Sequence, residues 1–342
     1  MTPKLKLLFI LLLFLFPCAY PRDVFRIMFY NVENLFDTEN NPLTQDDEFT
    51  PEGTRRWSKY RYYRKINNIA KVISSVGEWN YPALVGLCEV ENNRVLDDLT
   101  KYSPLKKAQY RYIITESEDI RGINVALLYQ REHFKYISHN NIPICFPNDS
   151  IRKTRDILHV TGEVLTGDTL DIFICHYPSR RGGEIESEPY RIFVSSLLRE
   201  KTDSLFSCRK KENIIIMGDF NDESSNKSIS EILSAKPIKE EINKSELYNL
   251  FLFLEQKSKI GTYKYQGQWN FLDRIIVSGN LLDQQNSFSI LSETGCIYQA
   301  DFLLTEDSTH GGKRPKKTFH GYKYEGGFSD HLPIMVDFGI EK

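Results

Sequence analysis

The sequence predicts one large α/β domain. Its 342 residues fit a domain of that size, and no Pro/Gly/Ser-rich linker or charge run divides them. Short apolar runs typical of buried strands alternate with longer segments that carry apolar residues at three- and four-residue spacings. Most of the strand-like runs end in a polar residue, and this pattern indicates where a site would form.

The first twenty residues are expected to be a signal peptide. Lys4 and Lys6 precede an apolar run of ten residues, 7–16, which is too short to span a membrane. We therefore expect export to the periplasm or beyond the cell, with residues 21–342 forming a single mature domain without a transmembrane helix. Lipid anchoring at Cys18 is the less favoured alternative, because Phe16 and Pro17 stand where small residues are expected.

Charge and cysteine content exclude some classes of protein. Removal of residues 1–20 leaves 42 Lys and Arg against 46 Asp and Glu, a net charge of −4. This balance weakens general binding of duplex nucleic acid but leaves room for a local basic groove. The five cysteines that remain fit no zinc-binding spacing, and Cys88 and Cys175 lie in apolar runs, where we expect them to be core residues.

The elements follow in order along the chain. Strands are expected at 26–30, 82–92, 110–115, 123–129, 159–165, 170–175, 214–217 and 268–278. Helices are expected at 55–76, 95–102 and 188–206, with short helical or covering segments at 230–233 and 247–254. The segment 142–150 is expected to be a loop, and 159–165 is expected to pair with 170–175 across the turn at 166–169.

Six strand ends carry polar side chains that could meet in one site. The residues are Asn31, Glu89, His176, Asp219 with Asn221, Asp273, and Asp330 with His331. Each alone has an ordinary explanation, such as a turn residue at Asp219 or a structural histidine at His176. Glu89 is the most informative, because a carboxylate in so apolar a run must be paired, hydrogen-bonded or bound to metal. Sites in α/β sheets gather at strand ends, so the six can converge.

The residue types indicate the chemistry. Carboxylates and amides without cysteine pairs suit Mg²⁺, with Mn²⁺ or Ca²⁺ as alternatives, rather than zinc. Histidines beside such a cation suit hydrolysis of phosphate esters. Arg180 and Arg181, which precede Gly182 and Gly183, have guanidinium groups that match phosphate geometry. Together with Trp269 and with Lys313 of the basic loop 313–317, they are the expected substrate-binding residues.

Motifs spread over almost the whole mature chain resemble those of the endonuclease/exonuclease/phosphatase superfamily, which includes deoxyribonuclease I, exonuclease III, bacterial sphingomyelinases and inositol-polyphosphate 5-phosphatases. They are Tyr30-Asn31-Val32-Glu33-Asn34, Glu89, His176, Gly218-Asp219-Phe220-Asn221, Leu272-Asp273 and Ser329-Asp330-His331-Leu332-Pro333. The resemblance implies a four-layer αββα sandwich of two mixed β-sheets. Among the members of this superfamily, the chain is most similar to secreted bacterial ones.

The resemblance also implies a role for each residue. Glu89 would hold the divalent cation, and Asn31 and Asp330 would complete or support its shell. Asn221 and His176 would donate to the phosphate, and Asp219 would orient or deprotonate the attacking water. Asp273 would orient His331, and the choice of Asp219 or His331 as general base stays open.

Three functions follow, and the sequence does not choose finally among them. The first is a secreted metal-dependent phosphodiesterase that acts as a nuclease on DNA or RNA. The second is a phosphatase or phosphodiesterase on a phospholipid or small phosphorylated molecule, which the net charge of −4 favours. The third is a non-catalytic binding module. Within the resembled superfamily, the histidine of the His176-Tyr177-Pro178 strand end is more similar to the deoxyribonuclease I, sphingomyelinase and phosphatase branches, and this resemblance argues against a DNA-repair enzyme. We expect a monomer without a stable protein partner.

Overall fold

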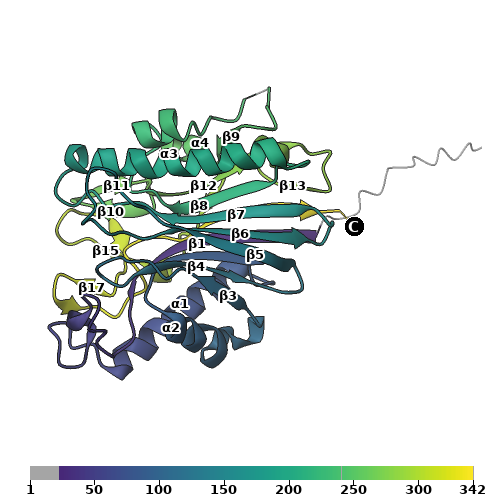
Figure 1. The fold of residues 1–342 in the computed structure, drawn as a ribbon. Coiled ribbons are helices and arrows are strands. Elements are labelled where there is room, and N and C mark those ends of the chain that lie inside the picture. Colours follow the sequence, from purple (N-terminus) through teal and green to yellow (C-terminus); the bar gives the residue numbers. More distant parts are fainter. Residues whose placement is uncertain (1–22, 240, 342) are drawn as a thin grey trace, which may run out of the picture.

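The computed structural model describes residues 23–239 and 241–341. The expected signal peptide and Cys18 lie outside the described residues. Two mixed β-sheets pack face to face between outer layers of helices (Figure 1). The predicted four-layer αββα sandwich is therefore confirmed.

The first sheet has the strand order β13-β19-β1-β2-β4-β3, and β14 pairs with β19 beside β13. Its strands are β1 (Asp23–Leu35), β2 (Leu84–Val90), β3 (Arg111–Ile114), β4 (Asn124–Tyr129), β13 (Phe288–Ile290), β14 (Cys296–Ile297) and β19 (Ile334–Ile340). Only β1 and β2 run parallel; the other pairs are antiparallel.

The second sheet has the order β5-β6-β7-β8-β12-β9. Its strands are β5 (Phe134–Ile142), β6 (Ile157–Val164), β7 (Thr169–His176), β8 (Ile214–Asp219), β9 (Leu247–Asn249) and β12 (Asp273–Ser278). Here β7 and β8 are the parallel pair. The predicted hairpin of 159–165 with 170–175 is confirmed as β6 and β7.

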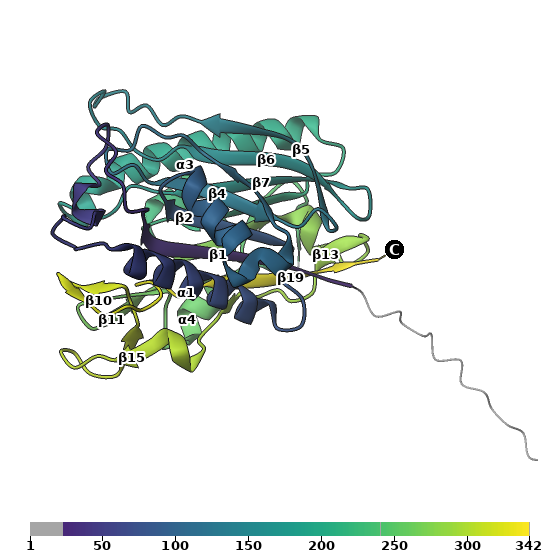
Figure 2. The same ribbon diagram turned by 90° about the horizontal axis from the view of Figure 1, so that it is seen from below.

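Helices cover the outer face of each sheet (Figures 1 and 2). On the first sheet lie α1 (Lys59–Gly77) and α2 (Asn93–Asp97), and α3 (Glu184–Cys208) lies on the second. The shorter helices are α4 (Leu252–Lys257), η1 (Asp47–Phe49), η2 (Asp98–Tyr102), η3 (Pro104–Ala108), η4 (Ser228–Ile232), η5 (Gly279–Leu282) and η6 (Asp301–Leu303). Within the described ranges, no helix is both long and apolar enough to cross a bilayer.

Three short hairpins extend one end of the sandwich, opposite the end where the chain terminates (Figure 1). They are β10 (Tyr263–Tyr265) with β11 (Gln268–Asn270), β15 (Leu304–Glu306) with β16 (Lys313–Pro315), and β17 (Phe319–His320) with β18 (Lys323–Tyr324). The hairpin of β10 and β11 contributes to the functional cavity described below.

Side-chain alternation along β8 builds two cores. Ile215 and Met217 face the first sheet, whereas Ile214 and Ile216 face α3, as the two-residue period of a strand requires. A strand buried on both faces reads as a continuous apolar run, which explains why 214–217 was recognisable. The predicted inner face of α1 is also confirmed: Tyr62, Ile66, Ile69, Ala70, Ile73 and Val76 are all buried.

Two predictions of local structure were wrong, and several strands, among them β5, β13 and β19, were not predicted. The edge strand β5 was missed because most of its residues are polar and exposed, so they carry no apolar alternation. The expected strand 268–278 is two strands, because 271–272 separate β11, in a small hairpin, from β12 in the second sheet. Residues 247–249 form strand β9 rather than a helix, since they pair with β12.

Candidate active site

The predicted polar strand ends meet at one end of the sandwich. The strands β1, β2, β7 and β8 all deliver their carboxyl ends there, and β12 and β19 begin there. In the register of the second sheet, Asp219 pairs with both His176 and Asp273. These ends line a cavity of about 730 Å³ beside β10 and β11. Its walls include Asn31, Glu89, His176, Asp219, Asn221, Asp330 and His331.

Gly218 allows Asp219 to reach this position. A Cβ atom at Gly218 would lie 2.3 Å from the carbonyl oxygen of Cys175 and 2.5 Å from its Sγ. No side chain fits at these distances, so the close approach of β7 and β8 requires glycine. The glycine of the Gly-Asp-Phe-Asn motif therefore sets the spacing at which Asp219 stands beside His176.

His331 and Asp273 form a buried hydrogen-bonded pair, with Asp273 behind the cavity wall. The Nδ1 of His331 lies 2.7 Å from Oδ2 of Asp273, and its Nε2 lies 3.8 Å from Oδ2 of Asp219. Burial alone would lower the pKa of His331, but the two carboxylates outweigh it and hold that pKa well above its usual range. The two carboxylates thus favour the protonated ring, whose Nε2–H could donate to an anion in the cavity.

Asp219 lies at the centre of the polar network. Its Oδ2 accepts a hydrogen bond from Nδ2 of Asn31 at 3.1 Å, and its Oδ1 accepts one from the backbone N–H of Asn221 at 3.0 Å. Burial raises the pKa of Asp219 to about 6, against the opposing charge of His331. A carboxylate with such a pKa is ionised at neutral pH and is basic enough to accept a proton from water in a general-base role.

His176 is placed as a neutral imidazole. Burial, followed by the positive charges of Arg155 and Arg121, lowers the pKa of His176 well below its usual range. Its Nε2 lies 3.5 Å from Oδ2 of Asp219 and 4.0 Å from Oε1 of Glu89. Its Nδ1 is buried and has no hydrogen-bond partner among the described residues. A neutral ring with its Nε2 at the cavity can donate a hydrogen bond to a phosphate oxygen.

Glu89 and Asp330 are the residues that best fit a divalent cation. Burial and the like charge of Glu89 raise the pKa of Asp330, and no described residue donates a hydrogen bond to its carboxylate. Glu89 accepts one hydrogen bond, from the backbone N–H of Asn34 at 2.8 Å. Two adjacent carboxylates with so few donors suit a hard cation, which would remove their repulsion. The Oδ1 of Asn31 accepts from the N–H of Glu33 and keeps a second lone pair for such an ion.

A second group of ligand atoms also lies close enough to hold a cation. Oxygen and nitrogen atoms of Asp219, Asp273 and His331 lie within 4.8 Å of one another. Nδ1 of His331 is bound to Asp273, so Nε2 is the ring nitrogen that could face an ion in this group. The cavity therefore offers two candidate cation sites, the Glu89 and Asp330 side and the group of Asp219, Asp273 and His331.

The predicted substrate-binding residues divide into two pairs. Arg180 and Arg181 line the cavity, but Arg180 also donates from Nε to the carbonyl oxygen of Asn221 at 2.7 Å. Trp269 and Lys313 are not brought to the cavity. Trp269 packs against the main core, and Nζ of Lys313 lies 3.4 Å from Oδ1 of Asp301. Their expected contact with substrate has no support in the geometry.

Several cavity residues were not predicted from the sequence, among them Arg121, Tyr263 and Tyr265. Arg121 lies just before β4, and its guanidinium is 3.8 Å from Oε1 of Glu89. The Tyr263 ring packs 4.8 Å from the His331 ring, centroid to centroid. Arg121 carries a weak signal, an arginine before a glycine between two strands. The two tyrosines carry none, because they lie in a short hairpin without a polar strand end.

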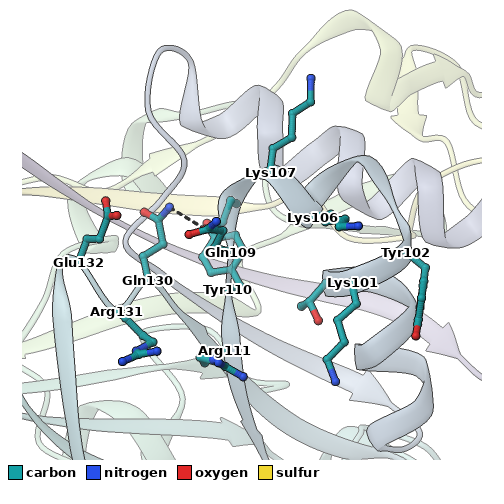
Figure 3. Close-up of a pocket in the computed structure, with 12 residues that line it drawn as sticks. Lys101, Tyr102, Lys106, Lys107, Gln109, Tyr110, Arg111, Gln130, Arg131 and Glu132 are labelled. Atoms are coloured by element: carbon teal, nitrogen blue, oxygen red, sulfur yellow. Dashed lines mark hydrogen bonds between the residues drawn. The ribbon is translucent and has the colours of Figure 1, made fainter.

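A larger hollow of about 970 Å³ lies elsewhere and has a different character. Figure 3 shows its mainly basic lining, with Glu132 the one acidic member of the set. It includes Arg111 and Gln130, at the start of β3 and just after β4. In the register of the first sheet, these positions lie beside the start of β2, whereas Glu89 lies near its end. This hollow contains no cluster of carboxylates and histidines, so size alone does not identify the site.

Comparison with known proteins identifies the family of the chain. The sequence profile of the Endonuclease/Exonuclease/phosphatase family matches residues 26–340. No curated protein matches the chain. An endonuclease/exonuclease/phosphatase family protein from Bacteroides thetaiotaomicron has a similar solved structure, with 16% identity, a TM-score of 0.57, and coverage of 94% of this chain and 97% of its own.

Two further solved structures are similar to the chain. The mannosyl-6-phosphatase Bt3783 of B. thetaiotaomicron is 17% identical, with a TM-score of 0.57 and coverage of 92% of this chain and 98% of its own. A humanized D. rerio TDP2 is 14% identical, with a TM-score of 0.57 and coverage of 92% and 99%. At these identities the similarity shows the fold, and the family profile shows membership. The chain belongs to the endonuclease/exonuclease/phosphatase family of phosphoric ester hydrolases.

Proposed function

We propose that the protein hydrolyses the phosphate ester of a compact organic phosphate in the presence of a divalent cation, with Asp219 as the general base. The observation that carries the proposal is that Asp219 and His331, both at the cavity wall, favour opposite protonation states. Asp219 has a pKa of about 6, whereas the pKa of His331 lies well above its usual range. An ionised carboxylate accepts a proton from water, and a protonated imidazole does not.

The remaining residues take positioning and donor roles. The protonated His331 and the neutral His176 would donate from Nε2 to phosphate oxygens, and Nδ2 of Asn31 would hold Asp219 in place. Asp273 keeps His331 charged and correctly oriented. Mg²⁺, held by Glu89 and Asp330 with support from Asn31, would supply charge stabilisation to the phosphate. Mn²⁺ and Ca²⁺ have compatible ligand preferences.

The charge of the cavity mouth supports a compact substrate. Three arginines line the cavity, and two of them already face carboxylates. Arg180 lies 3.2 Å from Glu184 and 3.5 Å from Asp222, and Arg121 lies 3.8 Å from Glu89. Proteins that follow a nucleic-acid backbone make many phosphate contacts from unpaired cations. One exposed arginine, Arg181, is too few for that mode but suits a substrate with one or two phosphates.

A nuclease, the function that the sequence favours first, is the second candidate. Arg181 and the exposed Tyr265 lie at the mouth of the cavity, and together they could hold a phosphate and a stacked base. Hydrolysis of a phospholipid or inositol phosphate belongs to the compact class. Export of residues 21–342 and a monomeric state are further proposals, tested by cell fractionation and by light scattering of the purified mature chain.

A substrate panel tests the proposal. Purified protein with Mg²⁺ or Mn²⁺ would be given sugar phosphates, inositol phosphates, nucleotides, sphingomyelin, plasmid DNA and RNA. We expect turnover of a small phosphate ester that varies little with ionic strength, and loss of that turnover in Asp219→Asn.

Cleavage of DNA or RNA with a steep salt dependence would favour the nuclease instead. In that case Arg181→Gln should flatten the salt dependence of the rate. The hydrolase proposal fails if no substrate is turned over with either cation, including bis-p-nitrophenyl phosphate and p-nitrophenyl phosphate.

A further inference from the structure

Lys65 of α1 is a fully buried lysine that does not line the cavity. Its Nζ donates to Oγ1 of Thr318 and to the carbonyl oxygen of Phe328, both at 2.6 Å, and lies 3.6 Å from Oε2 of Glu33. The ammonium group thus donates two hydrogen bonds and forms an ion pair with Glu33. Replacing a buried ion pair by apolar side chains is often neutral or stabilising. Stability alone therefore gives a weak reason for a lysine at this position.

Both hydrogen-bond acceptors belong to the segment that delivers the last site residues. Phe328 directly precedes Ser329, Asp330 and His331. The hydroxyl of Ser329 donates to the carbonyl oxygen of Asn31 at 2.7 Å and accepts from the N–H of His331 at 3.1 Å. The bond from Lys65 to the Phe328 carbonyl thus fixes the chain one residue before this contact.

Glu33, the ion-pair partner of Lys65, belongs to the end of β1. Its N–H donates to Oδ1 of Asn31 at 3.0 Å, and its Oε2 accepts from the N–H of Thr318 at 2.7 Å. Lys65 therefore joins α1 to two segments almost 300 residues apart in the sequence. One carries Asn31 and the other carries Asp330 and His331.

We propose that Lys65, acting with Glu33, is a positioning residue of the active site, which holds the Asp330–His331 segment in register with Asn31. This inference rests on the proposed hydrolytic function, because a rate is one of its readouts. The alternative is that the pair only adds stability. The two accounts predict different outcomes in a variant that folds without the lysine. Only a positioning role predicts that the Asp330–His331 segment is then displaced.

The double variant Lys65→Met/Glu33→Gln separates these accounts. Removing the lysine alone leaves the Glu33 carboxylate buried and unpaired, so Lys65→Met can fail to fold. Glutamine at position 33 removes that charge but can still accept from the Thr318 N–H. We expect the double variant to fold, yet without the anchor on the Phe328 carbonyl.

In the double variant we expect kcat to fall about a hundredfold, the effect of a misplacement of about 1 Å at a reacting group. KM should change less, because Arg181 and Tyr265 are not attached to Lys65. Arg209→Met is the matched control. It breaks a partly buried ion pair with Asp171, 2.7 Å long and near the start of β7, without touching the cavity. Its kcat should stay within twofold of the unaltered protein.

Proton NMR of the metal-free protein gives a readout that needs no substrate. The proton between His331 Nδ1 and Asp273 should resonate far downfield, and its loss in Asp273→Asn assigns it. The His159–Asp171 pair, 2.9 Å long, provides an internal reference. In the double variant we expect the His331 resonance to shift or broaden while that of His159 stays.

A double variant that keeps both the His331 resonance and kcat would overturn the proposal and leave Lys65 a purely stabilising residue. If the unaltered protein hydrolyses no phosphate ester, the proposed function fails, and the resonance alone still decides the role of Lys65.

Discussion

The hydrogen-bonded pair of Asp273 and His331 allows a test of the role assigned to His331. The test is a single conservative substitution of its partner. Asp273→Asn keeps the shape of the side chain but removes its charge. The 2.7 Å contact to Nδ1 of His331 is a charge-assisted hydrogen bond between buried groups. Such bonds contribute about 1.5–3 kcal/mol, which corresponds to about 1–2 pKa units at roughly 1.4 kcal/mol per unit.

In this variant, His331 should therefore lose its proton at a lower pH than in the unaltered protein. Burial lowers the pKa of this histidine, and Asp273 is the first of the charges that raise it. We expect the alkaline limb of the profile of kcat/KM against pH to move down by about 1–2 units. Loss of a positioned proton donor should also reduce kcat/KM at neutral pH by about 10²–10⁴-fold. The assay is hydrolysis of the best substrate from the panel at saturating Mg²⁺ between pH 5 and 10.

Asp171→Asn is the matched control, because it removes the carboxylate of another buried pair with histidine. Asp171 Oδ1 lies 2.9 Å from Nε2 of His159, outside the cavity. This variant should lose stability but keep the position of the alkaline limb. An unmoved alkaline limb in Asp273→Asn, with kcat/KM within twofold, would refute the role given to a protonated His331.

Two further predictions concern stability and metal dependence. Burial opposes ionisation of Asp171, but hydrogen bonds from His159, Arg209 and Thr161 lower its pKa to about 2. Its folded pKa lies below its unfolded value, so it stabilises the fold above about pH 4, and that contribution of about 2 kcal/mol is lost as the pH falls towards 2. Urea unfolding should show a smaller loss between pH 4 and 2.5 in Asp171→Asn, and equal losses would contradict the assignment. For Glu89→Gln we expect the Mg²⁺ concentration at half-maximal rate to rise about tenfold or more, because a charged ligand is lost. An unchanged Mg²⁺ titration would remove Glu89 from the metal site.

The parts of the site that follow strand geometry were predictable. Asp219 and His176 each end a buried strand, Asp273 begins the neighbouring one, and the strand register brings the three together. The rest of the cavity depends on segments whose position is set by tertiary contacts. Tyr263 reaches His331 through an isolated bridge between a short hairpin and the segment before β19. No local pattern in the sequence encodes that contact.

The same limit applies to the arginines. Arg180 was expected to bind substrate, but its hydrogen bond to the carbonyl oxygen of Asn221 makes it a support for the loop that presents Asn221. Arg121 was not expected to take part, yet it faces Glu89. Side-chain chemistry shows that an arginine can bind phosphate. Only the fold shows that Arg180 and Arg121 are already paired with carboxylates, whereas Arg181 is exposed at the cavity.

The backbone around Glu89 is strained, and no pattern in the sequence indicates this strain. Glu89 has φ 62°, Glu33 has φ 50° and Asn34 has φ 49°, all in the left-handed region. β1 and β2 both shift register here, β1 between Asn31 and Leu35 and β2 between Cys88 and Val90. Such a conformation costs a residue other than glycine about 1–2 kcal/mol.

Glycine at these positions would remove this cost, but it would not supply the side chains that the site uses. The turn of the backbone at Asn34 points its N–H at Oε2 of Glu89, 2.8 Å away, and leaves Oε1 towards the cavity. Glycine at position 89 would relieve the strain and delete the carboxylate together. The two adjacent bulges therefore turn the Glu89 carboxylate out of a strand that is otherwise buried and towards the cavity, where we propose that it holds a cation.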